Sequence, residues 1–411
     1  MKKEVPHDFV VQEVIAPASK SYAQRAILAA CLSKGTSVIH YPGHSDDVVN
    51  IIAIGSQLGA EIVVKGAILE ITGFQKAVRS ELNCGESGLG IRLTTSIAAG
   101  IGGKYEITGA GSLKNRPVDQ FEDFLPLLGV ECNTNNGLVP IQLNGKIQGG
   151  KIQLDGSLSS QFLSGLLMAL PLAEKDSTIE VKDLKSIPYI KMTLELLQKF
   201  EIQIEHDNFE TFRIKGNQKY QATAYTVEGD WSGAAFWMVY GTIAHDLQIR
   251  NLNSASLQAD REVLRAIEKA GGSFEWTDNL LKINKSEQLI PFEFDATHCP
   301  DLFPALTVLA AAIDGKSSIK GVKRLIHKES NRAFVLKNEF EKLGLQIEIE
   351  GDEMCIHGQG NLHGGEIHSN NDHRIAMAGA IAAALTETEI TIENAESVNK
   401  SYPEFWEVVG V

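Results

Sequence analysis

Hydrophobic and polar positions follow a pattern that repeats about every seventy residues along the chain. In each copy an amphipathic helix ends at a glycine, and a short stretch of alternating apolar and polar residues follows, as in a strand with one buried face. The glycines are Gly59, Gly129, Gly271, Gly344 and Gly410. One further copy has Phe200 in place of the glycine. The pattern therefore predicts six similar α/β units, although regular α/β spacing could also imitate a repeat.

A second kind of helix is predicted before each amphipathic one. The segments Glu86–Ala99, Gln161–Ala173 and Arg374–Leu385 are rich in Ala, Gly, Leu and Ile. A helix that is apolar most of the way round is usually buried. Each unit is therefore expected to run strand, helix, strand, helix, strand, strand (βαβαββ), with one helix inside and the other exposed.

The six units divide into two groups of three. The sixth unit runs out of chain after Gly410, whereas a predicted strand at Phe9–Ile15 has no helix before it. We expect this N-terminal strand to complete the second group, so that the chain passes between domains twice, at Ala16–Ser19 and at Glu228–Trp231. The predicted domains are residues 1–17 together with 229–411, and residues 18–228.

The overall charge and the cysteines exclude several classes of protein. The chain has 38 Lys and Arg against 52 Asp and Glu, a net charge of −14, which argues against a nucleic-acid binder. The longest apolar runs, Leu306–Ile313 and Ile375–Leu385, are too short to span a bilayer. The start lacks the apolar stretch of a signal peptide, and the five scattered cysteines indicate reduced thiols. We therefore expect a soluble cytoplasmic protein without a membrane or nucleic-acid partner.

Cationic side chains recur where a strand gives way to a helix. Free backbone N–H groups and the helix dipole favour anions at such points. The cations are Lys20, Arg25, Arg92, Arg116, Lys328, Arg332, Arg374 and Lys400. Serines precede two further helices, at Ser157–Ser160 and at Ser186, although a serine there is often only a cap. In an acidic chain, this set of cations predicts a site for small polyanionic molecules.

Motifs for other ligands are incomplete. Gly315–Ser317 resembles the end of a P-loop, but its first glycine would fall at Ala310. His363, His368 and His373 are spaced by five and do not share a helical face, so no metal site is predicted.

An ordered set of motifs resembles the family of 3-phosphoshikimate 1-carboxyvinyltransferases, or EPSP synthases, over essentially the whole chain. The motifs are Lys20-Ser21 with Arg25, Asp155–Gln161, Lys328–Arg332, Asn371–Arg374 and Lys400. The resemblance implies a two-domain inside-out α/β barrel, each domain built of three βαβαββ units, with the active site in the interdomain cleft. It implies a monomeric transferase of the shikimate pathway, which leads to chorismate and the aromatic amino acids. The reaction is transfer of the enolpyruvyl group of phosphoenolpyruvate to the 5-hydroxyl of shikimate 3-phosphate, with no metal or organic cofactor.

The resemblance also implies roles for individual residues. Shikimate 3-phosphate would be held by Lys20, Ser21, Arg25, Ser159, Ser160, Gln161, Ser186, Asp301 and Lys328. Phosphoenolpyruvate would be held by Lys20, Gly88, Arg116, Gln161, Arg332, Arg374 and Lys400. The catalytic residues would be Asp301 as base, Glu329 as acid and later base, and Lys20 as the alternative proton donor. The acid role requires a protonated Glu329, which the surrounding cations oppose.

The sequence departs from the family pattern at a few positions. Glu86 and Leu89 stand where many relatives have Asn and Thr, and Arg324 stands where a substrate-binding Asn is common. These departures leave the response to glyphosate, a competitor of phosphoenolpyruvate, open.

Two alternative functions remain. UDP-N-acetylglucosamine 1-carboxyvinyltransferase shares the fold and the donor, but it commonly has a Cys shortly before the Arg116–Asp119 motif, and Gly109–Asn115 contains none. Its N-terminal lysine is also usually followed by Asn, where Ser21 stands here. The chain could instead be an inactive paralogue that binds an anionic metabolite, although the joint presence of the implied catalytic residues argues against decay.

Overall fold

The computed structural model describes residues 1–74, 78–278 and 280–411. Contacts divide the chain into a central unit, Ala18–Val227, and a terminal unit that contains both chain ends, Met1–Pro17 with Glu228–Val411. None of the helices formed by the described residues is long and apolar enough to cross a membrane.

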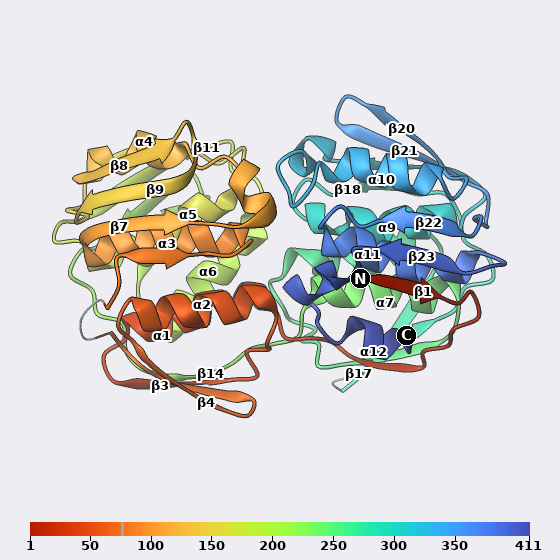
Figure 1. Ribbon diagram of the computed structural model, residues 1–411, viewed down its shortest axis with the longest axis horizontal. Helices are drawn as coiled ribbons and strands as arrows, with labels where there is room; N and C mark the ends of the chain where they lie inside the picture. The colour runs from red at the N-terminus through yellow and green to blue at the C-terminus, as the bar shows by residue number, and fades with distance from the viewer. Residues whose placement is uncertain (75–77, 279) are drawn as a thin grey trace. The chain divides into compact units, whose positions relative to one another are not determined.

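The central unit contains three βαβαββ units (Figure 1), and in the first of them the leading strand comes from the end of the unit, Ala224–Thr226. Its elements are α1 (Lys20–Leu32), β3 (Thr36–His40), α2 (Asp46–Gln57), β4 (Glu61–Lys65), β5 (Ile68–Thr72), β6 (Glu81–Asn83), α3 (Gly88–Ile101), β7 (Gly103–Thr108), η1 (Gly111–Asn115), α4 (Gln120–Phe124), η2 (Pro126–Leu128), β8 (Val130–Asn135), β9 (Leu138–Gly145), β10 (Lys151–Asp155), α5 (Ser160–Ala169), η3 (Leu170–Leu172), β11 (Ser177–Lys182), α6 (Ile187–Lys199), β12 (Ile204–Asp207), β13 (Thr211–Ile214) and β14 (Ala224–Thr226). The sheets run β14-β3-β5-β4, β6-β7-β9-β8 and β10-β11-β13-β12. In each sheet the first two strands are parallel and the last two form an antiparallel hairpin.

The terminal unit repeats the same plan. Its elements are β1 (Lys2–Val5), β2 (Glu13–Ile15), α7 (Trp231–Ile243), β15 (Leu247–Arg250), η4 (Ala259–Glu262), α8 (Val263–Lys269), β16 (Ser273–Thr277), β17 (Leu280–Asn284), β18 (Glu293–Asp295), η5 (Pro300–Leu302), α9 (Phe303–Ala311), β19 (Gly315–Lys320), η6 (Val322–Leu325), α10 (Arg332–Glu341), β20 (Gln346–Glu350), β21 (Glu353–Gly358), β22 (Gly365–His368), α11 (His373–Ala382), η7 (Ala383–Leu385), β23 (Ile390–Glu393), η8 (Ala395–Lys400) and α12 (Phe405–Val409). The sheets run β16-β17-β15-β2, β18-β19-β21-β20 and β1-β23-β22.

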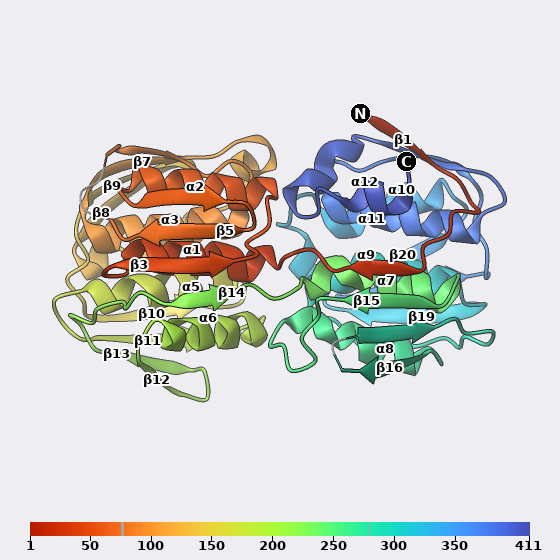
Figure 2. The same cartoon turned by 90° about the horizontal axis from the view of Figure 1, so that it is seen from below.

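The N-terminal strands pair with strands of the terminal unit. Strand β2 runs parallel to β15 (Figure 2), and β1 pairs antiparallel with β23, in the position of the strand that the sixth repeat lacks. In the central unit the last strand, β14, plays the same part by pairing with β3. Each unit is therefore closed by a strand that lies far away in the sequence from its partner.

The predicted strand Phe9–Ile15 is only partly correct. Strand β2 begins at Glu13, and Lys2–Val5 forms a strand that the pattern did not predict. The ring of Phe9 stacks on Tyr240, with centroids 4.8 Å apart, and the Tyr240 hydroxyl donates to the Phe9 carbonyl at 2.8 Å and accepts from the Val11 amide at 3.2 Å. A side chain thus satisfies backbone groups that a neighbouring strand would otherwise have satisfied.

The apolar helices form the interior, and the sheets lie outside them. Almost every residue of α3, α7, α9 and α11 is buried, whereas α10 buries only one face. The helix predicted at Gln161–Ala173 begins at Ser160 and changes to 3-10 geometry at Leu170, next to Pro171, which has no N–H to donate. Helices buried on all sides expose only their ends, so side chains at their first turns are well placed to meet a ligand.

The turn after each amphipathic helix needs a left-handed residue. Gly344 follows α10 with φ +88°. In the copy without a glycine, Phe200 keeps an ordinary φ of −96° and the next residue, Glu201, takes the left-handed conformation with φ +62°. The chain therefore still turns after this helix, but Glu201, a non-glycine residue, takes up a left-handed backbone conformation that side chains disfavour.

Candidate active site

Helix α1 of the central unit begins with one cation and buries a second. Lys20 is its first residue, and the Lys20 Nζ lies 3.0 Å from Asp47 Oδ2. Arg25 is 1% exposed and donates three hydrogen bonds. Its Nε donates to Thr193 Oγ1 at 2.9 Å, and its Nη1 donates to the Ser21 carbonyl at 2.8 Å. Its Nη2 donates to Ser164 Oγ at 3.3 Å. These partners are all uncharged, so burial lowers the pKa of Arg25 to about 10.

The starts of four helices meet around this arginine. Ser164 lies in the second turn of α5 and Thr193 in the second turn of α6, so their contacts with Arg25 bring the beginnings of α1, α5 and α6 together. Ser87, the N-cap of α3, donates to Gln24 Oε1 at 2.9 Å and adds a fourth helix start. Helix N-termini concentrate unpaired N–H groups and partial positive charge. This end of the central unit therefore suits an anion.

The predicted serines and glutamine lie at the same helix starts. Ser159 caps α5, and its Oγ accepts from the Gln161 amide at 3.2 Å. Ser160 is the first residue of α5, and Ser186 stands at the N-cap of α6 with φ +55°. The side-chain oxygen Oε1 of Gln161 is buried without a hydrogen-bond partner among the described residues. The structure thus brings the predicted binding residues of this unit to one end of it.

Arg116 lies directly against the start of α3. A Cβ atom added to Gly88, the first residue of that helix, would lie 2.3 to 2.6 Å from three atoms of the Arg116 guanidinium. Only glycine leaves room for this approach. Arg92, one turn further along, donates to the Gly88 carbonyl at 2.9 Å and the Pro117 carbonyl at 3.0 Å, and lies over the ring of Phe162. Arg92 therefore braces the loop that carries Arg116.

The residues that depart from the family pattern have structural partners. Oε2 of Glu86 accepts from the amide and the hydroxyl of Ser112, at 3.3 and 3.1 Å, in the segment that leads to Arg116. Leu89 is buried at the start of α3. Arg324, in η6, lies close enough to Lys328 for the two positive charges to repel each other.

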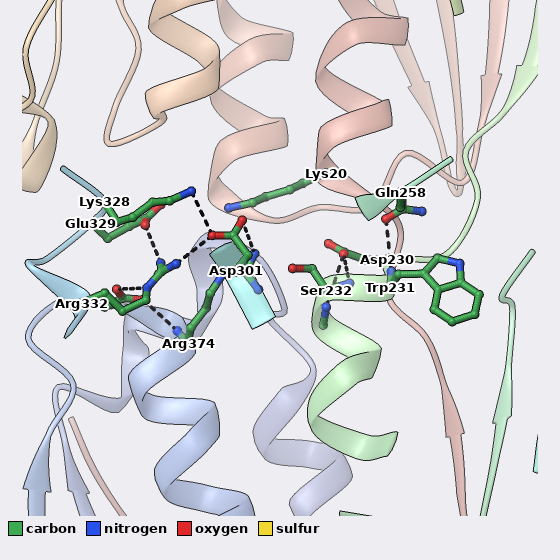
Figure 3. Close-up of polar contacts among 12 residues, drawn as sticks. Lys20, Asp230, Trp231, Ser232, Gln258, Asp301, Lys328, Glu329, Arg332 and Arg374 are labelled. Atoms are coloured by element: carbon green, nitrogen blue, oxygen red, sulfur yellow. Dashed lines mark hydrogen bonds and ion pairs between the residues drawn. The ribbon is translucent and has the colours of Figure 1, made fainter. Parts of the chain in front are cut away.

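Asp301 is the centre of the charged cluster in the terminal unit. Figure 3 shows three cations directed at its carboxylate: the Lys328 Nζ lies 3.1 Å and the Arg332 Nη1 2.8 Å from Oδ1, and the Arg374 Nη2 lies 3.3 Å from Oδ2. Burial alone would raise the pKa of Asp301, but attraction to Arg374, Lys328 and Arg332 outweighs burial and holds the pKa well below its usual value. Asp301 is therefore ionised at neutral pH.

Arg332 is surrounded by carboxylates. It is fully buried. Its Nη2 donates to Glu329 Oε2 at 2.7 Å, and its Nη1 donates to Asp301 Oδ1 at 2.8 Å. Its Nε and Nη2 also donate to Asp372 Oδ2 and Oδ1, at 2.8 and 3.1 Å. Burial would lower the pKa of Arg332, but Asp372, Glu329 and Asp301 together raise it above the ordinary value. Four of its five N–H groups donate to these carboxylates, so one N–H on Nη1 is left for a substrate.

Two further predicted cations lie near the ends of helices in the same unit. Arg374 is the second residue of α11, and its Nη1 is buried without a hydrogen-bond partner among the described residues. Lys400 is the last residue of η8 and is 6% exposed. Buried cationic groups of this kind favour an anionic ligand because they have already lost most of their water.

Sequence reasoning gave no role to two buried aspartates of the terminal unit, Asp372 and Asp260. Asp372 lies inside the Asn371–Arg374 motif at the N-cap of α11, so its position before Arg374 was a usable signal. Asp260, in η4, is 2% exposed; burial and the charge of Asp301 raise its pKa to about 6, although Arg374 and a hydrogen bond from Ser232 oppose the shift. No motif marks Asp260, because its charged neighbours come from distant segments.

Comparisons with known proteins agree over nearly the whole chain. The family model described as EPSP synthase (3-phosphoshikimate 1-carboxyvinyltransferase) matches residues 6–409. The 3-phosphoshikimate 1-carboxyvinyltransferase of Clostridium acetobutylicum is 38% identical over 402 residues, which is 96% of this chain and 93% of that protein. That of Clostridium kluyveri is 35% identical over 398 residues, with the same coverage of both chains.

The solved structures support the fold. EPSP synthase from Acinetobacter baumannii superposes with a TM-score of 0.83 at 24% identity, covering 100% of this chain and 97% of that chain. The enolpyruvyl transferase NikO from Streptomyces tendae gives a TM-score of 0.79 at 16% identity, covering 99% and 96%. These similarities confirm the predicted fold class, in which α/β units with buried helices build both halves of the chain.

Proposed function

Because the chain belongs to the EPSP synthase family, we propose that it transfers the enolpyruvyl group of phosphoenolpyruvate to the 5-hydroxyl of shikimate 3-phosphate. The hydroxyl oxygen bonds to C2 of phosphoenolpyruvate and loses its proton, while C3 gains a proton, which gives a tetrahedral intermediate. Loss of a proton from C3 then re-forms the double bond and expels inorganic phosphate. The enzyme acts as a monomer and uses no metal or organic cofactor.

The central unit supplies most of the shikimate 3-phosphate site. The observation that carries this assignment is Arg25, a buried arginine whose hydrogen-bond partners are neutral and which lies where four helices begin. Burying a cation without a counter-ion is unfavourable, and an anionic ligand would remove that cost. We assign shikimate 3-phosphate to Lys20, Ser21, Arg25, Ser159, Ser160, Gln161 and Ser186, with Asp301 and Lys328 from the terminal unit.

Phosphoenolpyruvate requires cations for both its carboxylate and its phosphate. Arg116, held against the backbone of Gly88, offers a planar guanidinium that can donate two parallel hydrogen bonds to either group. We assign the donor to Lys20, Gly88, Arg116, Gln161, Arg332, Arg374 and Lys400. Substrate-binding residues thus come from both units, which we take as the two domains, residues 18–228 and residues 1–17 with 229–411.

Asp301 is the base in this proposal, and the substrates themselves would increase its basicity. A carboxylate bound to three cations holds a proton poorly. When anionic substrates bind Lys328, Arg332 and Arg374, they share the positive charge that now stabilises ionised Asp301. The carboxylate then becomes better able to accept the hydroxyl proton.

The proton for C3 comes from Glu329 or Lys20. Glu329 accepts a hydrogen bond from Arg332 at 2.7 Å, and phosphoenolpyruvate bound to Arg332 would compete with Glu329 for that charge. The Lys20 Nζ lies 3.0 Å from Asp47 Oδ2 at the start of α1. In either case the same cations bring two mutually repelling anions into contact, which is catalysis by proximity and charge stabilisation.

The test is phosphate release from phosphoenolpyruvate with either shikimate 3-phosphate or UDP-N-acetylglucosamine as acceptor. We expect release with shikimate 3-phosphate alone. Release with only the sugar nucleotide would identify the sister enzyme, and release with neither would identify an inactive paralogue. Arg25→Ala should abolish the release, whereas Arg213→Ala, at an exposed pair with Asp207 in the same unit, should not.

A further inference from the structure

Arg25 is held by two buried hydroxyl groups. The Thr193 Oγ1 on α6 lies 2.9 Å from its Nε, and the Ser164 Oγ on α5 lies 3.3 Å from its Nη2. Both residues are 0% exposed. They therefore act on a ligand only through the arginine.

The hydrogen-bond directions around this pair are fixed by chemistry. Arginine has five N–H donors and no acceptor, so both hydroxyl oxygens must accept from it. The Thr193 hydroxyl proton is then left for the Tyr189 carbonyl at 2.8 Å or for Ser164 Oγ at 3.1 Å. Loss of either hydroxyl would leave a buried N–H of a charged group without its acceptor, which is costly.

The neutrality of these partners distinguishes Arg25 from the two buried arginines assigned to phosphoenolpyruvate in the terminal unit. Arg332 donates to three carboxylates, and Arg374 donates to Asp301. Arg25 uses three of its five N–H groups on Thr193, Ser164 and the Ser21 carbonyl, so one N–H on each terminal nitrogen is left for a ligand. Hydroxyl partners fix the direction of the guanidinium and leave its charge uncompensated.

We propose that Thr193 and Ser164 are positioning residues that hold Arg25 towards shikimate 3-phosphate without neutralising its charge. This inference rests on the proposed function, because it takes shikimate 3-phosphate as the ligand of Arg25. A carboxylate at either position would hold the arginine equally well and would compete with the anionic substrate. The hydroxyls thus provide orientation, and the substrate provides the counter-ion.

The experiment compares four variants by steady-state kinetics. Thr193→Val keeps the shape of the side chain and removes the hydroxyl; Thr193→Ser keeps the hydroxyl; Ser164→Ala removes the weaker partner. Thr95→Val is the matched control, since Thr95 is a fully buried threonine on α3 whose hydroxyl has no hydrogen-bond partner among the described residues. We expect the KM for shikimate 3-phosphate to rise about 10-fold or more in Thr193→Val.

The KM for phosphoenolpyruvate should stay within about twofold of the unmodified enzyme, because the donor is assigned to other side chains. Thr193→Ser should restore the KM for shikimate 3-phosphate, Ser164→Ala should raise it by less than Thr193→Val does, and Thr95→Val should leave it unchanged. Equal increases in both KM values, or a failure of Thr193→Ser to rescue, would show a general packing role and overturn the inference.

A binding measurement separates this inference from the proposed function. Shikimate 3-phosphate alone should raise the melting temperature of the unmodified protein, and Thr193→Val should lose most of that increase. If the unmodified protein neither turns over nor shows the increase, the proposed function fails and this inference fails with it. If the unmodified protein does both and Thr193→Val matches it, only the assignment of Thr193 and Ser164 is wrong.

Discussion

Arg332 and Asp372 form a two-bond pair in which Nε and Nη2 of the arginine donate to both carboxylate oxygens, at 2.8 and 3.1 Å, and neither side chain is exposed. Asp372 also caps α11 by accepting from the Arg374 amide at 3.0 Å. One carboxylate therefore fixes two arginines that we assign to phosphoenolpyruvate. Asp372 itself is not assigned a contact with the substrate.

Asp372→Asn should destabilise the protein by about 3 kcal/mol, because the neutral amide breaks a buried ion pair and cannot accept both hydrogen bonds from Arg332 as the carboxylate does. Urea unfolding measures this loss. The control is Asp207→Asn, which breaks the exposed pair with Arg213 and should have little measurable effect. Equal stability of the two variants would mean that the buried pair contributes no more than a surface pair.

Asp301→Asn should fold and should lower turnover by about 10²-fold or more, the usual scale for loss of a general base. The amide keeps the size of the side chain but cannot accept the hydroxyl proton. Turnover is followed by phosphate release, and near-normal turnover would remove Asp301 from the mechanism. A circular dichroism spectrum like that of the unmodified protein is the control for folding.

Gly88→Ala should weaken phosphoenolpyruvate binding and spare shikimate 3-phosphate. The added methyl group would lie 2.3 to 2.6 Å from the Arg116 guanidinium and must displace it. Because the guanidinium is the free end of a flexible side chain, we expect the protein to fold and the KM for phosphoenolpyruvate to rise about 10-fold. An unchanged KM would show that the position of Arg116 does not determine donor affinity.

Asp260→Asn should change the dependence of stability on pH. The pKa of Asp260 is raised to about 6, first by burial and then by Asp301, with Asp230 adding to the shift and Arg374 and Ser232 opposing it. The folded protein thus binds this proton more tightly than the unfolded chain, whose Asp has a pKa of about 3.9. The stabilisation is complete below about pH 3.9 and is lost as the pH rises through about 6.

The measurement for Asp260→Asn is the melting temperature of the variant and the unmodified protein at pH 5 and pH 8. The variant cannot ionise at this position, so its melting temperature relative to the unmodified protein should be higher at pH 8 than at pH 5. The same difference at both pH values would contradict the raised pKa.

The repeat could be predicted from the sequence because each copy contains its own local signal, a helix that ends at Gly59, Gly129 or a later equivalent. The sequence also led us to expect a strand near Phe9–Ile15, because the sixth unit lacked one. Its bounds were wrong, because the Tyr240 hydroxyl, far along the chain, binds the backbone around Phe9. Such a contact depends on the folded structure and has no local signal.

In the candidate site, too, some residues have a local signal in the sequence and others do not. Lys20, Arg116 and Arg374 could be identified because cations at helix starts are unusual and occur in ordered motifs. Thr193 and Asp260 were missed, because a buried threonine on a helix, or a single aspartate in a short 3-10 helix, is common in any protein. Only the three-dimensional arrangement shows that one lies beside Arg25 and the other near Asp301.

The pairing of β2 with β15 and of β1 with β23 has a consequence for synthesis on the ribosome. The central unit, Ala18–Val227, is complete in sequence once β14 has emerged, so it can fold while translation continues. Residues Met1–Pro17 emerge before the central unit but have no partner until β15 appears, and β1 must wait for β23. These residues, although translated before the central unit, therefore reach their native place after it.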